Sequence, residues 1–195
     1  MKKFTRLLLL ILGVISLIPT FALAHTGIGE TTGFGAGIGH PIEGSDHVLA
    51  MIAVGLWAVQ MGERAIFVMP ATFVTLMIFG GTLAIFGIHI PYFEGGILLS
   101  VIILGMLITS SSRFSLVASS FVVGAFALFH GQAHGTEIPL SIGALSYSLG
   151  FSLGTTLLHV VGIIGGLVLK RMDIEWVIRL IGGTIALGGV YLTVA

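Results

Sequence analysis

The sequence predicts an all-α integral membrane protein, built as a polytopic bundle of six transmembrane helices after a cleavable signal peptide. Hydrophobic residues make up 56% of the 195 positions and charged residues only 8%, and the mean hydropathy is +1.14. About a quarter of the residues in a soluble domain are charged, so this chain has too few charges to cover a water-facing surface. An N-terminal leader pattern and six long apolar segments are the other two observations behind this prediction.

The first 24 residues have the three parts of a secretory signal peptide. Basic residues stand at positions 2, 3 and 6, an apolar run covers 7–18, and Ala-Leu-Ala at 22–24 fits a cleavage site. Cleavage would make His25 the new N-terminus. We therefore expect a signal peptide over 1–24 and one six-helix transmembrane domain over 25–195.

Six apolar segments follow, each close to the ~20 residues that cross a hydrocarbon core. They cover roughly 37–61, 65–88, 95–111, 115–131, 139–169 and 174–194. The fifth is too long for a perpendicular span, so it must tilt, kink or project from the bilayer. The connections are short, which favours antiparallel neighbours in a compact bundle. Glycine at every second position from 33 to 39 leaves two interpretations open, an exposed tail or a closely packed half-helix.

The charged residues of the loops predict an orientation. A translocated signal peptide places the mature N-terminus outside, so both ends of a six-helix chain lie outside. The loops expected inside then hold Arg64, Arg113, Lys170 and Arg171, whereas the loops expected outside hold no Lys or Arg. This is the asymmetry that the positive-inside rule demands.

Composition also excludes several kinds of site. The chain has no cysteine, which removes disulfides, thiolate metal sites and cysteine nucleophiles. Its formal net charge is zero and no basic stretch resembles a nucleic-acid patch. Any metal site must therefore use imidazole, carboxylate, carbonyl or thioether ligands, a set that suits nickel, cobalt, zinc or copper when imidazole dominates.

The first candidate site is the stretch 39–47, which holds two histidines, two carboxylates, a proline and two glycines. Ionisable residues that enter a bilayer are costly and indicate a substrate or ion pathway. On a continuous helix, His40 and His47 are seven positions apart and share a face. Asp46 could ligate a metal directly or orient an imidazole from behind. The proline and glycines suggest a helix break that lets Asp46 and His47 meet an ion below the surface.

The second candidate site is the stretch 129–137, at the outer end of the fourth segment. His130 and His134 are four positions apart, a spacing able to place two imidazoles on one metal, and Glu137 follows at the helix exit. Glu94 begins the third segment and is either a metal ligand or a carboxylate stabilised by a helix N-terminus. In the expected topology these residues all map to the outer mouth of the bundle, facing the first stretch.

Three histidines stand apart from the two stretches. His25 belongs to the predicted N-terminal tail, and His89 and His159, taken singly, are expected to form hydrogen bonds between helices. His159 nevertheless ends a polar stripe on the fifth segment, formed by Ser141, Ser148, Ser152, Thr155 and His159. The hydroxyls alone favour a helix interface, whereas His159 favours an ion route. Glycines spaced four apart on the same segment predict close helix packing.

The motifs resemble those of the HupE/UreJ family of nickel and cobalt permeases. The resemblance rests on His40-Pro41, Gly44, Asp46-His47, Ala50-Met51, Gly55 and Trp57-Ala58, on Phe129-His130-Gly131, Ala133-His134-Gly135 and Glu137, and on Leu158-His159 with Gly162. It implies passage of nickel or cobalt across the bacterial inner membrane. Carried over by position, it implies that His40, Asp46, His47, His134 and Glu137 are ligands, with His130 and Glu94 next.

The main hypothesis is therefore a permease or facilitator, not an enzyme, with no permanently bound cofactor and with the metal as its transported ion. The expected partners are the lipid bilayer and a transition-metal ion, not nucleic acid, and assembly into a homo-oligomer stays open. The chain lacks the G-x-x-x-x-G-K-[ST] nucleotide-binding loop, so uptake would not be driven by bound ATP. An intramembrane zinc-dependent hydrolase is the alternative, and a non-transporting sensor subunit is a third hypothesis.

Overall fold

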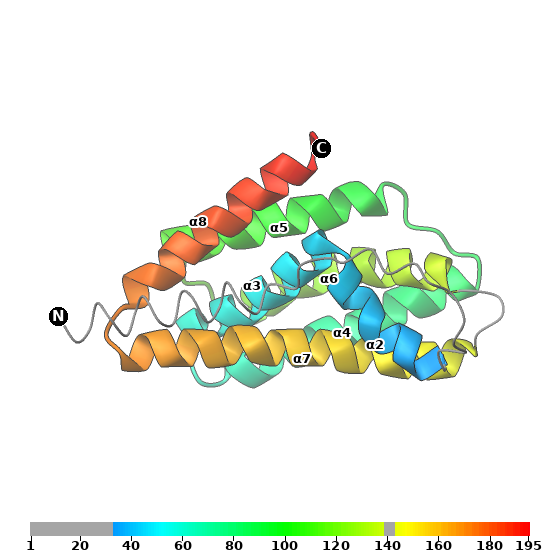
Figure 1. Cartoon of the computed structure of the whole chain (residues 1–195), viewed down its shortest axis with the longest axis horizontal. Coiled ribbons are helices and arrows are strands. Elements are labelled where there is room, and N and C mark those ends of the chain that lie inside the picture. Colours follow the sequence, from blue (N-terminus) through cyan, green and yellow to red (C-terminus); the bar gives the residue numbers. More distant parts are fainter. Residues whose placement is uncertain (1–32, 139–142) are drawn as a thin grey trace. The chain divides into compact units, whose positions relative to one another are not determined.

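The computed structural model describes residues 33–138 and 143–195, and all regular structure within them is helical (Figure 1). The helices are α2 (Gly33–Glu43), α3 (Ser45–Met61), α4 (Ala65–Ile85), α5 (Phe93–Ser110), α6 (Leu116–Glu137), α7 (Ala144–Arg171) and α8 (Glu175–Leu192). Five of them are long and apolar enough to cross a membrane, and a sixth span results if α2 and α3 count as one bent span. The predicted signal peptide lies outside the described residues.

The first predicted span is two helices joined at Gly44 and bent by 83°. Gly44 has an extended backbone, with φ −93° and ψ 116°, between the last residue of α2 and the first of α3. The predicted helix break is therefore confirmed. The prediction that His40 and His47 share one helical face is wrong, because counting along a helix does not carry across this bend.

The glycine-rich stretch before the break is a packed half-helix and not a tail. Figure 1 shows α2 lying across α7, and glycines on both helices make the close approach possible. A Cβ on Gly37 would collide with the Tyr147 carbonyl oxygen, and a Cβ on Gly150 with that of Phe34. The glycines of α7 that were predicted to allow close helix packing therefore pack in part against α2.

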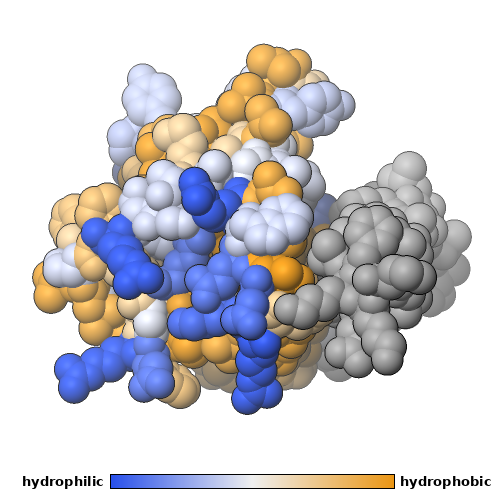
Figure 2. All heavy atoms as spheres, turned by 90° about the vertical axis from the view of Figure 1, so that its left-hand side faces the viewer, coloured by the Kyte–Doolittle hydropathy of each residue, from blue (hydrophilic) through white to orange (hydrophobic). Residues whose placement is uncertain are grey.

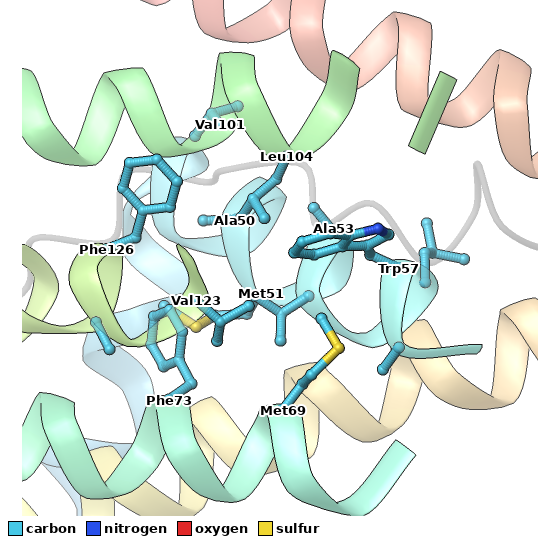
Figure 3. Close-up of a cluster of buried hydrophobic side chains, with 14 of the residues drawn as sticks. Ala50, Met51, Ala53, Trp57, Met69, Phe73, Val101, Leu104, Val123 and Phe126 are labelled. Atoms are coloured by element: carbon cyan, nitrogen blue, oxygen red, sulfur yellow. The ribbon is translucent and has the colours of Figure 1, made fainter. Parts of the chain in front are cut away.

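Helix α3 forms the centre of the core. Its side chains are apolar around the whole helix from Ala50 to Val59, the pattern of a helix buried on every side. Figure 3 shows Met51 and Trp57 of α3 among side chains from α4, α5 and α6. On its remaining side α3 packs against α7, where a Cβ on Gly55 would collide with the His159 carbonyl oxygen.

The other helices pack as two pairs around α3, α4 against α6 and α5 against α8. The α4–α6 contact is a backbone approach, since a Cβ on Gly131 would collide with the Met77 carbonyl oxygen. Helix α6 continues to Glu137, six residues beyond the predicted end at 131. The whole second candidate stretch is therefore helical, and its side chains have fixed positions on one helix.

The two ends of the helices differ in which charged and ionisable side chains they carry. One end carries the four basic residues that the sequence placed in the inner loops: Arg64 and Arg113 lie in connections, and Lys170 and Arg171 are the last two residues of α7. Figure 2 looks onto this end and shows hydrophilic residues gathered there. We call it the basic end. The end that holds His40, His134 and Glu137 is called the mouth.

Candidate metal centre

A three-residue cluster at the mouth joins α2 to α6. His40 of α2 and His134 and Glu137 of α6 each offer a ligand atom, and these atoms all lie within 4.8 Å of one another. His40 Nε2 is 3.0 Å from Glu137 Oε2, and His134 Nδ1 is 3.7 Å from the same oxygen. Two ring nitrogens and one carboxylate oxygen therefore lie near enough to one another to bind a shared ion.

Burial within this cluster is graded. The Glu137 side chain is 51% exposed and that of His40 is 27% exposed, whereas that of His134 is only 6% exposed. The carboxylate can therefore meet a hydrated ion first, and His134 can take it only after part of its water has been removed. A carboxylate at the surface with imidazoles beneath it is suited to capture followed by dehydration.

Asp46 fixes the orientation of His47 in the first turn of α3. The Asp46 Oδ1 atom accepts a hydrogen bond from the His47 backbone N–H at 2.8 Å and lies 2.7 Å from His47 Nδ1. Because a carboxylate accepts hydrogen bonds, neutral His47 carries its proton on Nδ1 and has a free lone pair on Nε2. That Nε2 atom is buried and has no hydrogen-bond partner among the described residues. Asp46 therefore fixes the tautomer and the orientation of the His47 ring, as a carboxylate does behind a metal-bound imidazole.

The backbone of its own helix sets the tautomer of the His130 ring in the same way. Its Nδ1 lies 2.9 Å from the Phe126 carbonyl oxygen, which can only accept. The neutral ring therefore also has its lone pair on Nε2, and this atom too is buried without a hydrogen-bond partner in the described part of the chain. Two imidazoles on different helices thus have buried Nε2 lone pairs of the kind that can bind a metal ion.

The four imidazoles form a continuous file from the mouth inwards, and we call it the histidine file. The ring centroids of His40 and His134 are 4.9 Å apart, those of His134 and His47 4.5 Å, and those of His47 and His130 5.1 Å. The order alternates between the broken first span and α6. An ion released by one ring therefore has the next within reach.

Aromatic side chains of α7 close one wall of the histidine file. Phe151 lies with its ring centroid 3.8 Å from that of His134, and Tyr147 lies 5.8 Å from His40. A cavity of about 230 Å³ between α4, α6 and α7 borders His134, and Ser148 and Ser152 of the polar stripe line it. The sequence analysis did not identify these aromatic residues as part of the site. An aromatic residue in an apolar helix looks the same in the sequence whether or not it lies beside a binding site.

The remaining candidates lie apart from the histidine file. Glu94 is exposed in the first turn of α5, and its side chain makes no ion pair or hydrogen bond with the described residues. His89 lies 3.2 Å from the Gln132 amide nitrogen, a side-chain contact of the kind expected for a single histidine. His159 makes no such bond, since neither of its buried ring nitrogens has a hydrogen-bond partner within the described residues. His25 lies outside the described residues.

Comparison with known proteins agrees with the motifs. The sequence model of a family described as "HupE / UreJ protein" matches residues 12–192, nearly the whole chain. The chain belongs to the HupE/UreJ family. Protein HupE of Rhizobium leguminosarum bv. viciae is 42% identical over 179 residues, which cover 91% of this chain and 92% of that protein. No solved structure matches. This membership in the HupE/UreJ family confirms the resemblance drawn from the motifs.

Proposed function

We propose that this HupE/UreJ protein is a secondary transporter of nickel or cobalt ions, which it passes across the inner membrane through the histidine file. Family membership supports a role associated with nickel or cobalt transport. The observation that carries the proposal is the mouth cluster, in which ligand atoms of His40, His134 and Glu137 gather within 4.8 Å. Such a cluster in an otherwise apolar helix bundle indicates an ion pathway.

The donor set fits a divalent ion that must both enter and leave. Imidazole nitrogens with one carboxylate oxygen suit nickel, cobalt or zinc. Three protein ligands leave positions for water, so an ion at the mouth keeps part of its hydration shell and can exchange. Conduction requires binding strong enough for entry and spread over several sites for exit. The successive ring contacts beyond His134 supply such sites.

The same proposal gives the protein its place in the membrane. Helices α2 and α3 together form the sixth span, bent at Gly44, and the mouth faces the periplasm. The basic end then faces the cytoplasm, in agreement with the positive-inside rule. A signal peptide over 1–24 that is removed on export completes this arrangement, with both mature termini on the periplasmic side.

The zinc hydrolase alternative receives less support from the site. A catalytic zinc has three protein ligands and an open position, and a separate carboxylate acts on the bound water. Glu137 is the single carboxylate of the mouth cluster, and Asp46 is engaged by His47. Neither carboxylate is therefore a free general base beside a zinc ion held by three histidines. The row of ring contacts that leads inwards from the mouth fits the passage of an ion better than hydrolysis.

Uptake into proteoliposomes tests the proposal. Purified wild-type protein should accumulate radiolabelled nickel or cobalt above protein-free liposomes, and each metal should compete with the other. His134→Ala should reduce the initial rate about tenfold or more, because it removes the buried ligand of the mouth cluster. Glu63→Gln, an exposed carboxylate near the basic end, is the matched control and should behave as wild type. Absence of wild-type accumulation of both metals would contradict the proposal.

A further inference from the structure

His159 is a buried imidazole that the mouth cluster does not include. It lies eight residues after Phe151 in α7, and a rise of ~1.5 Å per residue puts it about 12 Å further along the helix axis. Its side chain is fully buried, and neither ring nitrogen has a hydrogen-bond partner among the described residues. A buried polar group without a partner is destabilising, which calls for a compensating ligand.

Phe73 of α4 connects His159 to the histidine file. The Phe73 ring centroid is 5.2 Å from that of His130 and 5.1 Å from that of His159, and Phe73 is itself fully buried. One aromatic ring therefore contacts both the innermost imidazole of the file and His159. The row of rings that starts at the mouth continues to His159, with Phe73 as its single non-ligating member.

Other donors accompany His159 on the facing surfaces of α4 and α7. Thr155 is one turn before His159 and is fully buried, and its hydroxyl lies 3.7 Å from the Met77 sulfur. Met77 is in turn one turn after Phe73 on α4. The hydroxyl is thus one helix turn from the imidazole, and the thioether contacts the hydroxyl. A thioether is a ligand for soft transition-metal ions. The hydroxyl also continues the polar stripe whose upper members, Ser148 and Ser152, border the cavity at His134.

We propose that His159 is a second ion-binding station, deeper in the membrane than the histidine file and linked to it through the Phe73 ring, which contacts both His130 and His159. The inference rests on the proposed transport function and adds an inner site to it. Movement of Phe73 would pass the ion from His130 to His159. An imidazole supported by a hydroxyl and a thioether binds a divalent ion more weakly than the mouth cluster, and this order of affinities favours onward release.

The decisive variant is His159→Phe in the full-length protein. A phenyl ring keeps the packing against Phe73 and removes both nitrogens, so a purely structural role would survive the change. Titration of purified protein with cobalt(II), followed by visible absorption, should give two equivalents for wild type and one for the variant. The initial rate of cobalt uptake into proteoliposomes should fall about tenfold or more, with unchanged thermal stability.

Two further variants complete the test. Ser100→Ala removes a buried hydroxyl on α5 whose hydrogen bond goes to its own helix, and it should keep two equivalents and the wild-type rate. His159→Gln takes the place of His159→Phe if the latter is not recovered folded. Two equivalents and a wild-type rate in a folded His159 variant would overturn the inference. A wild-type protein that does not transport contradicts the proposed function instead, and the titration still tests the inner station.

Discussion

His40 Nε2 lies 3.0 Å from Glu137 Oε2, although 97 positions separate the two residues in the chain. The contact joins α2 to the last turn of α6 at the mouth. It depends on the bend at Gly44, which turns α2 away from the axis of α3. A straight first span would hold His40 and His47 on one helix, without the folded-back half-helix that brings His40 to Glu137.

Glu137→Gln should weaken metal binding at the mouth. The substitution keeps the size of the side chain and removes the negative charge that attracts the ion to the two imidazoles. We expect the dissociation constant for nickel to rise about tenfold or more, measured by calorimetric titration of purified protein. Glu63→Gln, which changes an exposed carboxylate near the basic end, is the control and should leave the constant unchanged. Equal affinities for wild type and Glu137→Gln would remove Glu137 from the site.

Asp46 should act by orienting His47, and two substitutions separate this role from direct ligation. Asparagine keeps an oxygen that can accept from His47 Nδ1–H and from the His47 backbone, whereas alanine removes it. We expect Asp46→Asn to retain most of the cobalt uptake and Asp46→Ala to lose about tenfold or more. If the two variants lose uptake equally, the carboxylate charge itself is required and Asp46 is a ligand.

Gly44→Ala should affect the site more than the fold. The backbone at Gly44 has φ −93°, which alanine adopts without strain. Its Cβ would lie 2.8 Å from both Asp46 Oδ1 and His47 Nδ1, so this orienting pair must shift. We expect a clear loss of cobalt affinity with little change in thermal unfolding. Gly39→Ala is the control, since its Cβ would meet only the Glu43 carboxylate at 3.8 Å.

Gly131→Ala and Gly165→Ala should change stability in opposite directions. A Cβ on Gly131 would collide with the Met77 carbonyl oxygen and force α4 and α6 apart. Overpacking of this kind typically costs about 1–3 kcal/mol, so the thermal unfolding temperature should fall. A Cβ on Gly165 would meet nothing within 4 Å, and alanine is the better helix former by about 1 kcal/mol. An unchanged midpoint for Gly131→Ala would show that the helices can separate without loss.

The sequence by itself determined the class of protein and the residue types of the site. Low charge and long apolar segments require a helical membrane protein, and the five long helices agree with this. The two stretches rich in histidine and carboxylate stood out because ionisable residues are costly in a bilayer. The broken first span was also predictable, since proline and glycine disfavour a continuous helix. Signal-peptide cleavage and membrane orientation stay predictions.

Only the tertiary structure decided which of these residues meet. Counting positions along the sequence predicts which side chains share a face only within one helix. The prediction failed for His40 and His47 because the 83° bend at Gly44 changes the direction of the chain between them. Packing between helices produces the pairing of His40 with Glu137 and the alternation of rings along the file. It also produces the contacts of Phe73 with His130 and His159. Glycines set those approaches by allowing backbones into contact, as Gly37 does against Tyr147, and nothing local in the sequence states which glycine faces which helix.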